Sequence, residues 1–365
     1  MFFLIFAGIF LLVAVVLLGY VATRVNKFYI VKKWVGESKG KRRFCMLLPI
    51  LVVFIFGYLD FVNTVIVVLH LGIFCLFFEL VQKVVQKVTG KESGYYVAGI
   101  VAIMSLAVYL TIGWYNAHHV WETHYQMVTS KDIGDKPCRI VGIADSHVGT
   151  TFDGEGFAKH MQEIEKTNPD VLVVAGDFVD DSTTKADMIR SCEALGEIKT
   201  TYGVYLCWGN HDEGYFDGRE FDFDELKAEL QKNRVEILED EAKLIDNRFY
   251  IIGREDYSYR ERKSMEELTK GLDTSKYMFV LDHQPHDFLA EAKAGVDMVL
   301  CGHTHGGQMF PIGITGELSG ANEKTYGLET RKDTNFIVTS GISDWAIKFK
   351  TATFSEYVVI DITKE

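Results

Sequence analysis

Three long apolar stretches fill the first third of this 365-residue chain and limit its fold more than any other feature. The longest run, 45–81, exceeds one membrane crossing and is interrupted by the polar sequence YLDFVNT, so we interpret it as two helices joined by a tight turn. Soluble proteins seldom bury uncharged runs of this length, whereas each run suits a hydrocarbon core. We therefore predict a transmembrane region over residues 1–116, with helices at 2–22, 45–60, 63–81 and 95–115.

The first of these stretches has an alternative interpretation as a secretory signal peptide. Signal peptides start with basic residues, have a shorter apolar segment and end in small residues at the cleavage site. Residues 2–22 show none of these three features clearly. We therefore favour a helix that is retained.

Basic side chains are concentrated between the predicted helices. The loop 23–43 contains eight Lys and Arg residues, and Lys83, Lys87 and Lys91 follow the third helix. Cytoplasmic loops of membrane proteins are enriched in Lys and Arg, so we expect both loops in the cytoplasm. With four spans, both termini then lie on the extracytoplasmic side of the cell membrane, together with the acidic part of the chain that follows the fourth helix. One long span in place of the second and third helices would reverse this orientation.

Charge divides the chain in two. Residues 1–116 carry 11 of the 38 basic and 4 of the 50 acidic side chains, a balance of +7, so the remainder carries −19. Nucleic-acid binding depends on a basic surface, so no nucleic-acid partner is expected. The six cysteines match neither a zinc nor a disulfide pattern and read as small buried apolar groups.

After a predicted linker at 117–136, short apolar runs alternate with polar, amphipathic stretches. Runs such as VLVVAGD have the length and β-branched content of strands, and strands alternate with helices early but cluster late. This order indicates a layered α/β or α-β-β-α sandwich over residues 137–365. The predicted strands lie within 138–145, 171–177, 203–212, 248–253, 277–284, 296–305, 334–342 and 355–363, and the predicted helices within 157–170, 186–199 and 222–234.

Carboxylate, imidazole and amide side chains follow five of these predicted strands. They are Asp145, His147, Asp177, Asp180, Asn210, His211, Asp212, His283, His303 and His305. A polar turn would explain any one group, but ligands of open α/β sheets bind at the carboxyl ends of the strands. The last two histidines lie in CGHTHGGQ, a loop too rich in glycine for a helix, where both imidazoles can face one point. Five such strand ends together predict a metal site.

The motifs D-S-H, G-D-F-V-D, G-N-H-D, a lone strand-end His and G-H-T-H, in this order, resemble those of the calcineurin-like metallophosphoesterases over residues 138–365. The following G-G-Q and the apolar N-terminus resemble the membrane-associated bacterial branch of that family. The resemblance implies a four-layer α-β-β-α sandwich and a site for two divalent metal ions. The ligands it implies are Asp145, His147 and His305 for one ion, Asn210, His283 and His303 for the other, and Asp177 bridging both. Mixed nitrogen and oxygen ligands suit Mn, Fe, Zn or Co better than Mg or Ca.

The reaction implied by the resemblance is hydrolysis of a phosphodiester by a hydroxide that bridges the two metal ions. His211 would act as general acid toward the leaving group, and Asp180 would orient it. For Asp212 we expect hydrogen bonding within its loop. The expected partners are a phosphate ester, including a lipid-linked or cell-envelope ester, and the lipid bilayer. A phosphomonoesterase is the alternative, and a non-catalytic metal-binding scaffold is disfavoured because no motif residue is missing.

Loops are expected to determine the substrate, and three are candidates, 213–222, 253–263 and 309–330. The second contains Arg254, Arg260 and Arg262, which could pair with phosphate. A solvated charged loop is the default interpretation of these arginines.

Overall fold

The computed structural model describes residues 2–134, 136–216, 218–311 and 313–365. The chain forms two compact units, Met1–Ile112 and Gly113–Glu365, which we call the helical unit and the α/β unit and describe separately.

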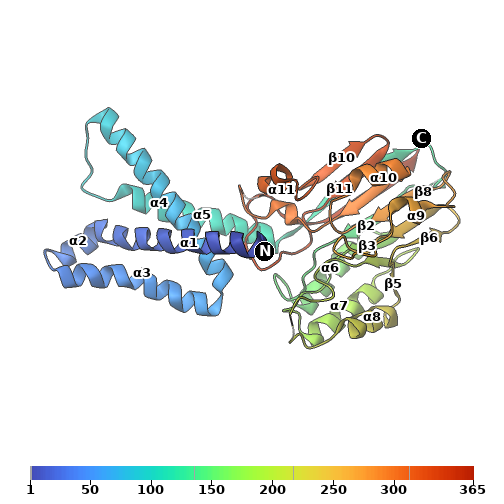
Figure 1. The fold of residues 1–365 in the computed structure, drawn as a ribbon, viewed down its shortest axis with the longest axis horizontal. Coiled ribbons are helices and arrows are strands. Elements are labelled where there is room, and N and C mark those ends of the chain that lie inside the picture. Colours follow the sequence, from blue (N-terminus) through green and yellow to red (C-terminus); the bar gives the residue numbers. More distant parts are fainter. Residues whose placement is uncertain (1, 135, 217, 312) are drawn as a thin grey trace. The chain divides into compact units, whose positions relative to one another are not determined.

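The helical unit is built from long apolar helices. Its elements are α1 (Phe2–Arg24), η1 (Val25–Lys27), α2 (Tyr29–Val35), α3 (Lys39–Leu59), α4 (Phe61–Thr89) and the greater part of α5 (Val97–His118). Helix α1 packs against both α3 and α4 (Figure 1). The four helices predicted from the sequence are confirmed as helices, and α1, α3, α4 and α5 are long and apolar enough to cross a membrane.

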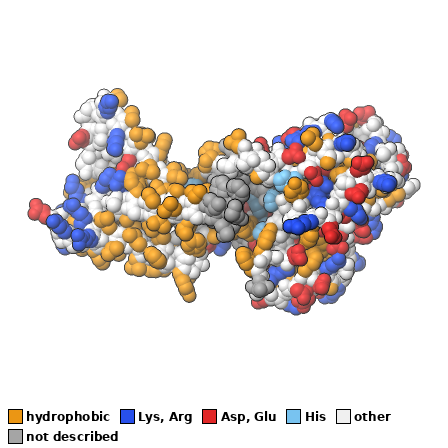
Figure 2. All heavy atoms as spheres, in the orientation of Figure 1, with side chains coloured by type: hydrophobic (Ala, Val, Ile, Leu, Met, Phe, Trp, Pro, Cys, Tyr) orange, Lys and Arg blue, Asp and Glu red, His pale blue; other side chains and the backbone are white. Residues whose placement is uncertain are grey.

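The polar sequence between α3 and α4 ends one helix and begins the next. Asp60 leaves the helical conformation, and its carboxylate accepts a hydrogen bond from the backbone N–H of Asn63 at 3.1 Å, which caps α4. Apolar side chains such as Leu12 and Phe54 are exposed along α1 and α3, and Figure 2 shows such side chains over much of the helical unit. A surface of this kind suits a lipid environment better than water.

The α/β unit contains two six-stranded sheets. The first has the order β1 (Val120–Thr129), β12 (Ser355–Lys364), β2 (Cys138–Ile143), β3 (Val171–Ala175), β4 (Val204–Cys207) and β5 (Val235–Ile237). The second has the order β10 (Gly327–Arg331), β11 (Thr334–Val338), β9 (Met298–Cys301), β8 (Tyr277–Leu281), β7 (Phe249–Gly253) and β6 (Glu241–Ile245). In the first sheet β2 to β5 are parallel, and β12 runs antiparallel to β2. In the second, β7, β8, β9 and β11 are parallel.

Both sheets are buried on both faces, so their central strands are apolar without a polar alternation. In β2, Ile140 packs into the core between the two sheets, whereas Val141 packs against the helices α6 (Gly154–Glu165), α7 (Lys185–Glu197) and α8 (Phe223–Lys232). Helices α9 (Met265–Thr269) and α10 (Phe288–Ala294) cover the outer face of the second sheet (Figure 1). The order of layers is helix, sheet, sheet, helix, and the predicted α-β-β-α sandwich is confirmed.

The predicted linker at 117–136 is wrong, because ten of its residues form β1. This strand pairs along its whole length with β12 in parallel register, from Val120 opposite Ser355 to Thr129 opposite Lys364. The α/β unit consequently begins at Gly113 instead of residue 137. In the sequence VWETHYQMVT the apolar residues are interrupted by polar ones and the strand is only partly buried, so no continuous apolar run marks it as a strand.

Several smaller elements were also not predicted, namely β5, β6, β10, α9, α10 and α11 (Ile314–Ser319). All six cysteines are buried and unpaired, which confirms their interpretation as small apolar groups.

Candidate metal centre

The predicted site residues lie where five strands end. The loops after β2, β3 and β4 of the first sheet meet those after β8 and β9 of the second. Two groups of ligand atoms, each within 4.8 Å of one another, result: Asp145, His147 and His305, and Asp177, His283 and His303. The first group contains the three residues expected for one ion, and the second joins the expected bridge Asp177 to His283 and His303. A third group, not expected, joins His147 to Asp180 and His211.

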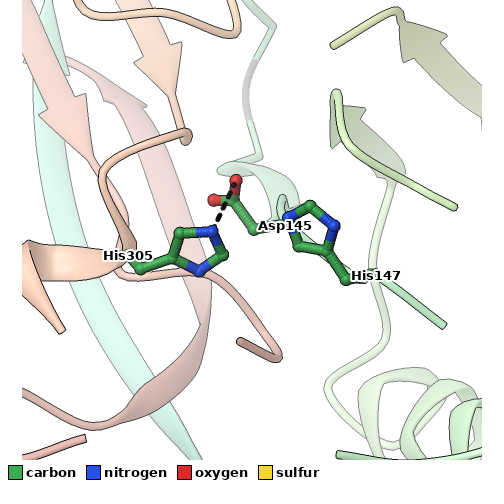
Figure 3. Close-up of side chains that lie close together, drawn as sticks. All are labelled: Asp145, His147 and His305. Atoms are coloured by element: carbon green, nitrogen blue, oxygen red, sulfur yellow. Dashed lines mark ion pairs between the residues drawn. The ribbon is translucent and has the colours of Figure 1, made fainter. Parts of the chain in front are cut away.

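The first group brings together the loops after β2 and β9 (Figure 3). Nε2 of His305 lies 3.9 Å from Oδ1 of Asp145, and the rings of His147 and His305 stack with centroids 5.1 Å apart. Asp145 is fixed in turn by the backbone N–H of His303, which donates to its carboxylate at 2.9 Å. Two imidazoles and a carboxylate therefore converge in a buried position.

Asp177 belongs to the second group and also lies close to His147 of the first. Its Oδ2 is 3.1 Å from Nε2 of His283 and 3.5 Å from Nε2 of His147. The Nδ1–H of His283 donates to the carbonyl oxygen of Ala175 at 2.8 Å, so Nε2 is the nitrogen that faces the site. One carboxylate oxygen thus faces an imidazole from each group.

Asn210 lies at the same edge of the sheets. Its amide nitrogen donates to the hydroxyl of Tyr215 at 2.7 Å, and its oxygen accepts a 3.4 Å hydrogen bond from Gln284, the residue after His283. The structure thus places Asn210 beside Gln284, next in sequence to His283, and its expected role as a ligand stays a prediction.

The backbone is strained at five of the seven predicted ligands. Asp145, His147, Asp177, His303 and His305 all have φ between 35° and 70°, a left-handed conformation that non-glycine residues rarely adopt. Such conformations cost on the order of 1 kcal/mol each and cluster at functional sites. Close packing adds to this: a side chain at Gly209 would clash with Asp177, and a Cβ at Gly302 would lie 2.6 Å from Oδ2 of Asp145.

The side chain of Asp212 connects two of these loops through hydrogen bonds to their backbones. Its Oδ1 accepts the backbone N–H groups of Phe178 at 2.8 Å and Val179 at 3.1 Å, and its Oδ2 accepts those of Asp177 at 3.0 Å and Gly209 at 2.7 Å. Only the bond from Gly209 lies within the loop of Asp212, as expected from the sequence, whereas the other three donors belong to the loop after β3. A fully buried carboxylate thus ties the loop after β3 to the loop after β4.

His211 occupies the more exposed side of the site. Its backbone N–H donates to Oδ1 of Asp177 at 2.8 Å, and its Nδ1 lies 3.1 Å from Oδ1 of Asp180. Burial lowers the pKa of His211, but the carboxylates of Asp180 and Asp177 more than offset this and hold the pKa above its ordinary value. The rings of Tyr215 and Trp345 lie 4.9 Å and 5.3 Å from the His211 ring.

The polar atoms of the site fit bound cations. Burial lowers the pKa of His147 and of His303 to about 4, so both imidazoles are neutral at pH 7 and offer lone pairs. Within the described part of the chain, neither ring nitrogen of His147 has a hydrogen-bond partner, although both are buried. Buried polar atoms normally have a partner, and buried carboxylates such as Asp145 and Asp177 need positive charge nearby. Two divalent metal ions would satisfy both requirements.

Two residues near the first group were not predicted. Oδ1 of Asp344 lies 3.9 Å from Nδ1 of His305 and forms a 3.0 Å ion pair with Lys350, and both Asp344 and Lys350 are fully buried. Asp344 is placed to orient His305, as a carboxylate behind a ligating imidazole commonly does. Neither lies in a predicted motif. Trp345 also falls outside the three loops considered from the sequence, whereas Tyr215 lies in the first of them.

Arg254 and Arg262 are neither solvated nor available to a phosphate. Arg254 is 2 % exposed and forms ion pairs with Asp282, at 2.8 Å, and Glu291, at 3.3 Å. Arg262 also pairs with Asp282, directly before His283. The default interpretation as a solvated loop is wrong for these two residues, because both are buried and form ion pairs with carboxylates distant in sequence.

Comparison with known proteins gives a consistent result. The family model described as calcineurin-like phosphoesterase matches residues 138–307. An uncharacterized metallophosphoesterase of Aquifex aeolicus is 32 % identical over 198 residues, which cover 52 % of this chain and 72 % of that protein. A transmembrane protein with metallophosphoesterase domain from Danio rerio is 27 % identical over 234 residues, 60 % of this chain and 51 % of that protein.

A solved structure, that of a dimetal phosphatase from Danio rerio, aligns with this chain at 12 % sequence identity. The alignment covers 57 % of this chain and 88 % of the phosphatase chain. Its TM-score of 0.38 is too low to bear on the assignment.

Proposed function

Because this chain belongs to the calcineurin-like metallophosphoesterase family, we propose that it is a metal-dependent phosphoesterase that hydrolyses a phosphodiester with two divalent metal ions, Mn, Fe, Zn or Co. The observation that carries the proposal is the position of Asp177, whose Oδ2 faces an imidazole from each ligand group. When bound, the metal pair supplies Lewis acidity, which polarises a phosphoryl group and lowers the pKa of water.

The ligand assignment follows the two groups. Asp145, His147 and His305 would hold one ion, Asn210, His283 and His303 the other, and Asp177 both. Neutral imidazoles limit the negative charge of the site, so an anionic phosphate ester can approach. The strained loops and the bonds to Asp212 hold the ligands in place before a metal ion arrives, which favours affinity because little ordering remains to be done.

His211 would donate a proton to the leaving-group oxygen. Its Nδ1–H donates to Asp180, so Nε2 is the nitrogen left to face the substrate. Asp180 fixes the ring orientation and stabilises the imidazolium, as the carboxylate behind a catalytic histidine does. Removal of a general acid typically lowers turnover by about 10²–10⁴.

The rings beside His211 support a substrate with an apolar or aromatic group on its leaving side. Tyr215 is 56 % and Trp345 37 % exposed, so both can contact a bound molecule. The leaving group of a lipid-linked or cell-envelope diester would supply such an apolar part. A phosphomonoesterase is the alternative, since its substrate needs only the metal pair and His211.

The test uses the full-length protein in detergent, loaded with Mn²⁺. We expect close to two metal ions per chain by elemental analysis, loss of metal in Asp177→Ala, and faster hydrolysis of bis-p-nitrophenyl phosphate than of p-nitrophenyl phosphate. A stoichiometry near zero would refute the dinuclear centre, and the reverse substrate preference would favour the monoesterase.

His211→Ala should lower turnover by about 10²–10⁴ and keep its metal content. The matched control is His124→Ala, since His124 is a half-exposed histidine on β1 away from the strand ends. The loss should shrink for esters with better leaving groups, which need less protonation. Loss of metal from the His211 variant would instead make His211 a ligand, as the third group of His147, Asp180 and His211 would allow.

Membrane association is indicated by the four apolar helices and by the transmembrane relatives. We extend this to four spans with the α/β unit outside the cytoplasm, since the two basic loops resist translocation. Protease added to right-side-out spheroplasts should then cut the α/β unit and spare the loop 23–43. Cleavage of the α/β unit only after permeabilisation would refute this orientation.

A further inference from the structure

A polar cavity of about 620 Å³ lies in the helical unit, apart from the metal centre. Its wall comes from the end of α1, η1, α2, the start of α3, the second half of α4 and the segment before α5. Figure 2 shows Lys and Arg side chains gathered at the α2 end of this unit. The charged residues that line the cavity are Lys27, Lys32, Glu79, Lys83 and Arg42.

The single lining carboxylate neutralises only part of this charge. Glu79 accepts hydrogen bonds from Arg24 at 3.0 Å, from Lys27 at 2.8 Å and from the hydroxyl of Tyr96 at 2.6 Å. These contacts fix Glu79 and Lys27 in one wall of the cavity. Among the described residues, no carboxylate pairs with the other three lining cations, Lys32, Arg42 and Lys83. The cavity therefore has an excess of positive charge with no internal partner.

Asn26 adds an unsatisfied acceptor to the same wall. Its amide nitrogen donates to the backbone oxygen of Arg42 at 3.2 Å, whereas its buried Oδ1 has no hydrogen-bond partner in the described part of the chain. Buried carbonyl oxygens normally accept a hydrogen bond. A ligand with a hydroxyl group beside its anionic group would satisfy Asn26 and the cations together.

We propose that this cavity binds the headgroup of an anionic phospholipid, through its phosphate and a hydroxyl group. The ends of membrane-spanning helices lie at the depth of the headgroups, where Lys and Arg attract anionic lipids. Its volume suits a headgroup, since small-molecule sites occupy about 300–1,000 Å³. The proposal requires that the helices cross a membrane and does not require hydrolysis by the α/β unit. A soluble organic phosphate has the same chemistry, so the experiment separates the two sources.

The test compares two triple variants of the full-length protein. Lys32→Gln, Arg42→Gln and Lys83→Gln remove the unpaired cations of the cavity. The matched control removes three exposed cations from the same helices that do not line it, by Lys33→Gln, Arg43→Gln and Lys87→Gln. Detergent-solubilised proteins are titrated with short-chain phosphatidylglycerol, phosphatidylcholine or glycerol 3-phosphate, and bound molecules are counted by native mass spectrometry.

We expect the wild type and the control to retain phosphatidylglycerol over phosphatidylcholine, and the cavity variant to bind it about tenfold or more weakly. Equal weakening in both variants would show attraction to basic charge in general and overturn the proposal. Binding of glycerol 3-phosphate as tightly as the lipid would assign the cavity to a soluble phosphate and overturn it as well. Equal melting temperatures of the variants establish that both are folded.

Discussion

Asp212→Asn tests the view that one buried carboxylate holds the two loops that carry Asp177 and His211. The substitution keeps the shape of the side chain but replaces one of two acceptor oxygens with an NH₂ group. Each oxygen accepts two backbone N–H groups, so two buried donors lose their partner whichever way the amide turns. A buried donor without a partner costs about 1–3 kcal/mol, so we expect a loss of about 2–6 kcal/mol in the free energy of unfolding.

The assay is thermal unfolding of the full-length protein in detergent. At about 2–4 °C per kcal/mol for a domain of this size, the expected fall in Tm is about 4–24 °C. Asp181→Asn is the matched control, because Asp181 also accepts two loop N–H groups, from Tyr215 at 2.9 Å and Phe216 at 3.2 Å, but at the surface. The fall should persist in EDTA, since the bonds involve no metal. Equal shifts for Asp212→Asn and Asp181→Asn would refute the reasoning.

Three further outcomes are expected. EDTA should lower the Tm of the wild type and Mn²⁺ should restore it, with about 2.7 kcal/mol of stabilisation at 100 times Kd, and an unchanged Tm would speak against a metal site. Burial, with Glu239 and Asp240 nearby, raises the pKa of Glu255 to about 7, above its unfolded value near 4.5, so the wild type loses stability as the pH rises between these values. Glu255→Gln should therefore stabilise the half-buried site by about 1 kcal/mol at pH 8 and not at pH 5, and an equal gain at both pH values in denaturation curves would contradict this. Lys350→Met should cost about 3–5 kcal/mol by leaving Asp344 buried without its cation, and Asp344→Asn in the same protein should recover part of the loss; no recovery would mean that the ion pair is not the cause.

The parts of the fold that are regular in the sequence could be predicted. Strands such as β3 and β9 are short, fully buried and apolar, and their ends are marked by Asp177 and His303. The half-exposed β1 and short β5 lack that signal, since a strand with one open face is recognised mainly by its neighbours. No local pattern in residues 120–129 identifies β12 as their partner.

The same limit applies to the site. The ligand residues follow strands and share motifs, so their meeting at one edge is a consequence of the topology. Asp344 and Trp345 come from a loop after β11, and only the three-dimensional path of that loop places them beside His305 and His211. The burial of Arg254 likewise depends on Asp282, which lies on another strand end.

The place of β12 between β1 and β2 has a consequence for how the protein is made. The first sheet cannot be completed until residues 355–364 have been synthesised, long after β1 and β2. At about 5–20 residues per second, the ribosome needs on the order of 10–40 s to travel that distance. During this time both early strands keep an open edge, and open edges pair readily with other chains. Synthesis of β12 and its pairing with β1 and β2 would then close both open strand edges. Ribosome stalling in the last third of the message should therefore promote aggregation more than stalling in the first third.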